Sequence, residues 1–255
     1  IALRAAGQLV KTEARTTQFR WYFLIFVPAL GGLLCGLLTR KAPETRGGGG
    51  DAAIEAFHYK GGDVPTRVLW VKPAASIATL GTGGSGGREG PTMQIGAAIG
   101  AAVGRYLSLT GRERRTRMVA GIAAGISAVF RTPLGAALLA IEVLYRDDFE
   151  SEALIPAVLA SVIAYSVALS VFGTEPLFGN LPRYPFHPKQ LPLFALLALA
   201  ISAFAVLFEK MLELARRVFA KLPGPEWSRP AVGGLGLGLF VVLLMFTFDP
   251  WVGNL

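Results

Sequence analysis

Long apolar runs separated by short polar segments recur along this chain. The runs that reach the length of a membrane-spanning helix, about 20 residues, are residues 19–39, 154–172, 191–208 and 231–248. Trp21 and Tyr22 lie near one end of the first run, and such aromatic side chains collect at membrane–water interfaces. The pattern predicts a multi-pass, all-α integral membrane protein.

The region between residues 47 and 145 follows a different pattern. Its apolar segments are short, and they are interrupted by GGGGD at 47–51, Pro73, GSGGREGP at 84–91 and RTP at 131–133. In lipid, each unpaired N–H or C=O costs on the order of several kcal/mol, so non-helical backbone is stable only where protein or water surrounds it. The region therefore predicts helices that break partway through the bilayer, around a buried polar pathway.

Small residues supply the expected helix packing in this region. Gly96, Gly100 and Gly104 recur every four residues, as do Gly121 and Gly125. This spacing gives flat faces along which helices approach closely. We interpret these glycines as structural.

Composition agrees with a membrane environment. Hydrophobic residues make up 53% of the 255 residues and charged residues 16%, against about a quarter charged in soluble domains. The mean hydropathy is +0.50. The net charge of +8 is concentrated in short clusters such as GRERRTR at 111–117, which we interpret as loops beside cytoplasmic anionic lipid. Nucleic acid is a disfavoured partner, since no aromatic platform accompanies these arginines.

Cysteine and histidine chemistry is not expected. Cys35 is the single cysteine, so it forms no disulfide within the chain. His58 and His187 are far apart in sequence and have no neighbours at metal-ligand spacing, so we expect neither a metal nor a cofactor. The polar start of the chain and its end, FDPWVGNL at 248–255, lead us to expect a longer protein on both sides.

Glu89 is the residue with the clearest functional implication. An ionised carboxylate near the bilayer centre is costly and usually lines a substrate path. The backbone beside it is exposed at Gly86, Gly87 and Gly90, and Pro91 suits the first turn of a helix predicted over 91–106. The N–H groups and positive dipole end of that helix would form an anion site from backbone alone. The alternative is that Glu89 only caps its helix.

A second segment of the same kind is RGGGGDAAIEAF at 46–57. Its glycines, followed by Asp51 and a short helix, again present backbone amides at a helix start; the alternative is a flexible loop with Asp51 as an ordinary N-cap. Two half-helices that direct their positive ends to one place would bind an anion without a buried Lys or Arg. Weak binding at several positions is what ion conduction requires.

The glycines also raise a nucleotide site as an alternative. Gly81, Gly83 and Gly86 fit G-x-G-x-x-G, a fingerprint that needs a preceding strand and an acidic residue about 20 positions on. Pro73 disfavours the strand, and YLSLT at 106–110 holds no carboxylate. A membrane-bound nucleotide-using enzyme is therefore a remote alternative, and a purely structural membrane protein would leave Glu89 without a role.

The segments GREGPTMQIGAAIG at 87–100 and GIAAGISAVFRTPLGAALLAIEVL at 121–144 resemble the CLC family of chloride channels and chloride/proton exchangers. The first segment is close to the family's G-(K/R)-E-G-P motif, and the likeness extends over nearly the whole chain. The resemblance implies an inverted-repeat, all-helical fold with broken and re-entrant helices. Residues 1–172 would be the first repeat, 173–190 a connecting loop and 191–255 the start of the second repeat.

The resemblance also implies a homodimer in the plasma (inner) membrane, with one pore per subunit that carries chloride or a related anion. Glu89 would be the gating glutamate, whose carboxylate occupies an anion position and leaves it when protonated or displaced. Helices around 133–145 and 151–172 would contribute to the dimer interface. The amides of Arg88 and Gly90 would line the outer anion position, and the full anion-binding set would be Gly48, Gly49, Gly50, Gly87, Arg88, Glu89 and Gly90.

Three departures from the family pattern bear on function. Gly49 replaces the serine that offers a hydroxyl to the central anion, which leaves the preferred anion open. Val143, next to Glu142, replaces the internal proton-transfer glutamate of the exchangers, and a valine carries no proton. The family's later G-x-F-x-P motif and pore-closing tyrosine are absent from these 255 residues. We therefore expect a passive chloride channel gated by Glu89, with a chloride/proton exchanger as the first alternative.

Overall fold

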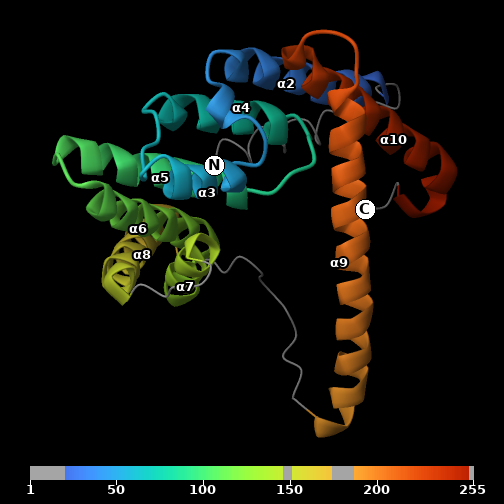
Figure 1. Cartoon of the computed structure of the whole chain (residues 1–255). Coiled ribbons are helices and arrows are strands. Elements are labelled where there is room, and N and C mark those ends of the chain that lie inside the picture. The colour runs from blue at the N-terminus through green and yellow to red at the C-terminus, as the bar shows by residue number, and fades with distance from the viewer. Residues whose placement is uncertain (1–20, 146–150, 174–186, 253–255) are drawn as a thin grey trace. The chain divides into compact units, whose positions relative to one another are not determined.

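The computed structural model describes residues 21–145, 151–173 and 187–252. Within these ranges the regular structure is helical, without strands (Figure 1). The polar start of the chain, most of the expected connecting loop at 173–190 and the last three residues lie outside the described residues.

The four long apolar runs form four long helices. These are α2 (Trp21–Arg40), α8 (Ser151–Phe172), α9 (Leu191–Ala220) and α10 (Arg229–Val252). Each contains a stretch long and apolar enough to cross a membrane, which confirms the predicted spans in the described residues. Helix α9 continues past the predicted end at residue 208, and Arg217 pairs there with Glu213 one turn earlier at 2.5 Å.

The region between residues 47 and 145 contains five helices of unequal length. Three are too short for a span of about 20 residues, as expected of broken helices: α3 (Gly50–Tyr59), α4 (Val68–Gly81) and α7 (Pro133–Leu144). The other two are longer, with 18 residues in α5 (Glu89–Tyr106) and 20 in α6 (Gly111–Phe130). Because α6 begins with the charged cluster at 111–117, its apolar part is shorter than the helix.

Helices α5 and α6 cross along the glycine faces that the sequence predicts. A β-carbon on Gly96 would overlap the carbonyl oxygen of Gly121, and one on Gly121 would overlap that of Gly96. A β-carbon on Gly125 would lie 3.0 Å from the oxygen of Thr92. The structural role of these glycines is confirmed, and fully buried side chains such as Met118 and Ile122 continue the core toward α7 and α8.

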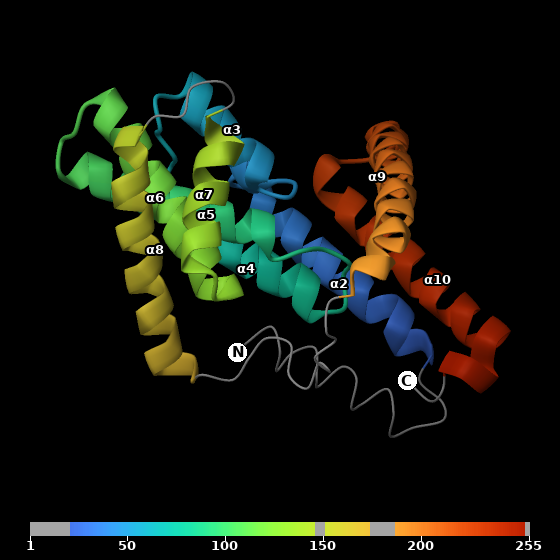
Figure 2. The same cartoon turned by 90° about the horizontal axis from the view of Figure 1, so that it is seen from below.

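Helices α2 and α10 form a second close crossing, seen side by side in Figure 2. On α10, a β-carbon on Gly234 would overlap the oxygen of Pro28, and one on Gly238 would lie 2.5 Å from the oxygen of Leu24. On α2, Gly32 and Gly36 meet the backbone just before and at the start of α10 in the same way. The backbones of these two helices therefore touch, as small residues allow in membranes.

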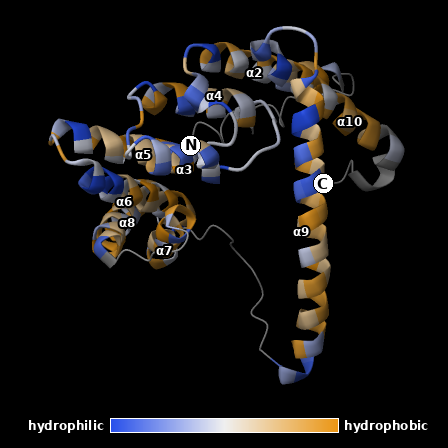
Figure 3. Ribbon diagram, viewed as in Figure 1, coloured by the Kyte–Doolittle hydropathy of each residue, from blue (hydrophilic) through white to orange (hydrophobic). Residues whose placement is uncertain are grey.

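Helix α9 belongs to a separate compact unit, residues 175–225, while α10 belongs with residues 1–174. None of the residues of α9 is buried. Its first turns are apolar, and hydrophilic positions appear toward its C-terminal end (Figure 3).

Candidate functional site

The two glycine segments at 48–50 and 87–90 lie next to each other, where α3 and α5 begin. A β-carbon on Gly49 would lie 2.7 Å from the carbonyl oxygen of Gly90, and one on Gly90 would overlap the carbonyl oxygen of Gly48. Gly49 has a φ of +105°, in the region that favours glycine. The structure thus brings together two segments that the sequence separates by α4.

Both helices begin without a side-chain cap. The N-cap of α3 is Gly49 and that of α5 is Arg88, and neither start carries a side-chain cap hydrogen bond. The first N–H groups of a helix have no partner within it and carry about half a positive charge. Asp51 is the second residue of α3, so the alternative that it is the ordinary N-cap is wrong. Two adjacent helix starts of this kind suit a small anion.

Glu89 is the first residue of α5 and is exposed in the described chain. The N-cap position itself belongs to Arg88, and Glu89 lies in the first turn, where an acidic side chain also stabilises a helix. Its carboxylate lies against Gly87, where a β-carbon on Gly87 would overlap Oε2 of Glu89. Pro91 falls within the first turn, where its missing N–H loses no helix bond. The helix thus begins two residues before the predicted start at 91.

The segment before α3, residues 41–49, is held by buried side chains that the sequence analysis missed. We call this segment the strap. Lys72 is 3% exposed, and its Nζ donates to the carbonyl oxygens of Thr45 at 3.0 Å and Gly47 at 2.8 Å. Gln94 is 2% exposed, and its Nε2 donates to the carbonyl oxygen of Glu44 at 2.6 Å. The available signal was a lysine inside the apolar segment WVKPAASIATL at 70–80.

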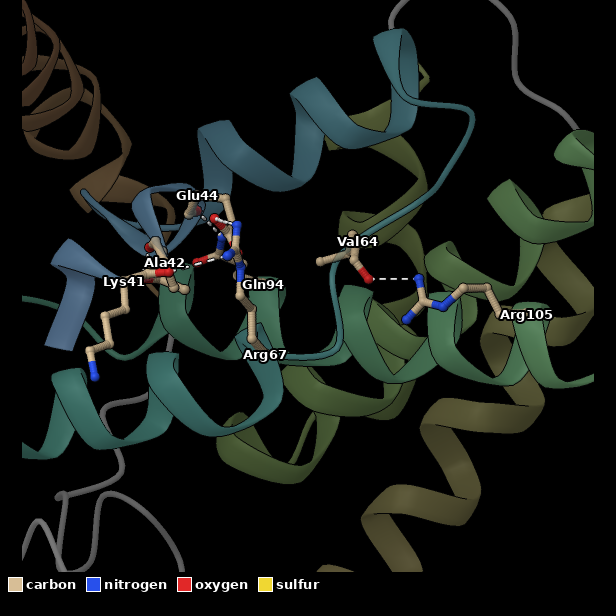
Figure 4. A network of polar contacts seen from close by, with 8 residues as sticks. Lys41, Ala42, Glu44, Val64, Arg67, Gln94 and Arg105 are labelled. Atoms are coloured by element: carbon tan, nitrogen blue, oxygen red, sulfur yellow. Dashed lines mark hydrogen bonds and ion pairs between the residues drawn. The ribbon is translucent and has the colours of Figure 1, made fainter.

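Arg67 secures the exposed edge of the strap. Its Nε and Nη2 donate to the two carboxylate oxygens of Glu44 at 2.5 and 2.9 Å, and its Nη1 donates to the carbonyl oxygen of Lys41 at 3.2 Å. Figure 4 shows Arg67 and Gln94 meeting at Glu44. The side chains of Arg67, Lys72 and Gln94 therefore donate to carbonyl oxygens along the strap. The strap in turn leads into the amides at the start of α3.

Val143 and Glu142 lie near the end of α7. Val143 is partly buried and packs against the core, whereas Glu142 is exposed.

The nucleotide fingerprint lacks its structural context. Gly81 ends helix α4, whereas the dinucleotide motif follows a strand. Gly83 then turns the chain with a φ of +94°. This alternative is therefore not supported in the described residues.

Comparison with known proteins places the chain in a family. A family model described as the voltage gated chloride channel matches residues 31–254. The chain therefore belongs to the voltage gated chloride channel family, which is the CLC family that the motifs resemble. It is an all-α membrane protein with part of the CLC fold.

Individual relatives agree with this assignment. The H(+)/Cl(-) exchange transporter ClcA of Citrobacter koseri is 33% identical over 240 residues, which cover 90% of this chain and 50% of the relative. The crystal structure of a CLC-type fluoride/proton antiporter matches with a TM-score of 0.76 at 28% identity, covering 95% of this chain and 61% of that one.

A slow cyanobacterial Cl-/H+ antiporter has the same fold, with a TM-score of 0.79 at 23% identity over 94% of this chain and 57% of that one. The chain thus spans about half the length of the curated relatives it matches.

Proposed function

We propose that this protein moves chloride across a membrane in exchange for protons, through a CLC-type pore. The observation that carries the anion-binding part is the meeting of two uncapped helix starts at Gly49 and Gly90. The proton-exchange part is supported by its relatives, since the Citrobacter koseri protein and both solved structures are named as proton-coupled transporters. These names favour the exchanger over the passive channel that the sequence leads us to expect.

In this proposal the anion is held by backbone amides of residues 48–50 and 87–90. Amide dipoles bind a chloride more weakly than a direct ammonium contact would, and weak binding allows the ion to leave. The ammonium of Lys72 donates to carbonyls of the strap and adds positive charge behind the site.

Glu89 acts as the gate. Its carboxylate stands at the positive end of α5 and competes with the anion for the same amides. Protonation removes the negative charge, so the carboxyl group gives up its place to the anion and carries a proton as it moves. The resting contact with Gly87 is the closed position in this scheme.

A passive chloride channel is the second candidate, and Val143 favours it. A valine at the position of the internal proton-transfer glutamate leaves no titratable group there, and Glu142 beside it is exposed. In either case we propose a homodimer in the plasma membrane, with α7 and α8 at the interface.

A liposome experiment distinguishes the two candidates. The longest natural polypeptide that contains residues 1–255 is reconstituted in vesicles loaded with chloride, an outward gradient is imposed, and external chloride and pH are followed together. Exchange predicts chloride efflux with proton uptake in a constant ratio, whereas a passive channel predicts chloride efflux alone. The same vesicles loaded with fluoride or nitrate report the preferred anion.

The Glu89→Gln variant tests the gate in the same assay. Removing the charge should abolish proton coupling and make chloride flux independent of external pH. Chloride flux, coupling and pH dependence identical to those of the unmodified protein would contradict the role of Glu89.

A further inference from the structure

Gln94 contacts both glycine segments of the candidate site. It lies four residues after Gly90 on α5, so its side chain projects from the same face of the helix. Its Cβ and its Oε1 each lie 3.1 Å from the place where a β-carbon on Gly49 would be. One buried side chain therefore fills the space beside Gly49 where a larger residue would extend.

The orientation of the Gln94 amide follows from its partner. The carbonyl oxygen of Glu44 only accepts hydrogen bonds, so the Nε2 of Gln94 must face it, and the 2.6 Å contact agrees. The Oε1 is then turned toward Gly49 and has no hydrogen-bond partner among the described residues. The side chain thus binds the strap at Glu44 and lies against it at Gly49.

Gln94 differs from the other residues that hold the strap. Arg67 and Lys72 connect the strap to α4 and its N-cap, whereas Gln94 connects it to α5. Because α5 also carries Glu89, the Gln94 contact links the amides of one glycine segment to the helix that begins at the other. Loss of this link would let the two helix starts shift relative to each other.

We infer that Gln94 is a positioning residue, which keeps the amides of Gly48–Gly50 in register with the start of α5 and so sets the affinity for the anion. The inference rests on the proposed anion transport. A shift of a few tenths of an ångström at either helix start changes the distance from its N–H groups to a shared ion, so the effect is expected in the affinity for the anion.

The test compares chloride transport at one fixed pH for Gln94→Met and Gln94→Glu. Methionine keeps the length of the side chain without a donor; an ionised glutamate keeps the shape, cannot donate, and adds a negative charge. The KM for chloride should rise about three- to tenfold in Gln94→Met, the change that one lost hydrogen bond brings, and further in Gln94→Glu. The maximal rate per folded protein should stay within about twofold for Gln94→Met.

Ser127→Ala is the matched control. Ser127 is fully buried and its hydroxyl donates to the carbonyl oxygen of Ser161 at 2.7 Å, at the contact between α6 and α8. This variant also loses one buried hydrogen bond from a side chain to the backbone, so its melting temperature should fall while the KM for chloride is unchanged.

The outcomes distinguish a positioning role of Gln94 from a purely structural one. A lower melting temperature with an unchanged KM in both Gln94 variants would show a purely structural role and overturn the inference. If Gln94→Met yields too little folded protein, Gln94→Glu is the test: a raised KM for chloride supports the inference, and an unchanged KM overturns it. An effect of Glu89→Gln without any effect of the Gln94 variants leaves the proposed function in place, whereas absence of chloride transport by the unmodified protein removes both.

Discussion

Glycines at the candidate site differ in what a side chain would meet. A β-carbon on Gly48 has no atom within 4 Å, whereas one on Gly49 meets the oxygen of Gly90 at 2.7 Å and is also strained by the φ of +105°. A β-carbon on Gly87 meets only the flexible end of Glu89. We therefore expect the same substitution to alanine to have a different effect at each of these three glycines.

Gly87→Ala should displace the Glu89 carboxylate while leaving its charge intact. Since the methyl group occupies the resting position at every pH, we expect chloride flux at neutral pH to rise about two- to tenfold and its pH dependence to become shallower. Flux measured from pH 4 to pH 8 checks this. Gly86→Ala is the control, because its β-carbon meets only the end of Leu80, at 3.1 Å, and should leave the profile unchanged.

Lys72→Met should weaken the binding of the transported anion, because Lys72 holds the strap. The change leaves the carbonyl oxygens of Thr45 and Gly47 without their buried donor and removes a positive charge behind the site. We expect the KM for chloride to rise by about tenfold or more. Lys72→Arg keeps the charge and should have the smaller effect; equal values for the two variants would argue against an electrostatic contribution.

Among the helices, the starts differ in whether a side chain accepts hydrogen bonds from the first N–H groups. The start of α6 is closed by a capping box, in which Thr110 N–H and hydroxyl bind Glu113 at 2.9 and 2.7 Å. The starts of α3 and α5 have no such side chain. The starts of α4 and α7 also lack a side-chain cap hydrogen bond. What distinguishes α3 and α5 is that their starts meet at Gly49 and Gly90, which is the electrostatic basis of the proposed site.

The crossing of α2 and α10 gives a matched pair of substitutions two residues apart. A β-carbon on Gly238 would press on the backbone of Leu24 and Ile25, whereas one on Gly236 meets nothing within 4 Å. We expect Gly238→Ala to destabilise the protein by about 1–3 kcal/mol, as overpacking does. Gly236→Ala should be neutral or stabilising by up to about 1 kcal/mol, since alanine favours helix. Thermal unfolding in detergent compares them, and equal melting temperatures would contradict the observed crossing.

For the whole molecule, α8 presents an apolar stripe to its surroundings. Side chains at intervals of four residues are exposed: Ile155, Leu159, Ile163, Val167 and Val171. Such a stripe faces lipid or another subunit. The stripe lies on α8, one of the two helices of the proposed dimer interface.

Ile163→Trp tests that interface. A bulky ring in the middle of the stripe should shift the protein from dimer toward monomer, measured by light scattering in detergent, with little change in chloride flux if each subunit holds its own pore. Leu30→Trp, at an exposed position of α2, is the control and should keep the dimer. An unchanged dimer in Ile163→Trp would place the interface elsewhere.

Local patterns in the chain were sufficient for the membrane location, the four long helices, the glycine faces of α5 and α6 and the two candidate helix starts. Each of these depends on hydropathy, on residue spacing along one helix or on the lack of a side chain. Such properties are carried by neighbouring residues, so they are readable without knowledge of distant contacts.

Folding in three dimensions decided how these parts combine. The contact of Gly49 with Gly90, the hold of Lys72 and Gln94 on the strap and the packing of α10 on α2 join residues that are far apart in sequence. A buried hydrogen bond between a side chain and a distant carbonyl leaves no periodic signal, because any polar residue at the right place can make it. That is why Gln94 was indistinguishable from other residues of its helix until the strap was seen to lie on it.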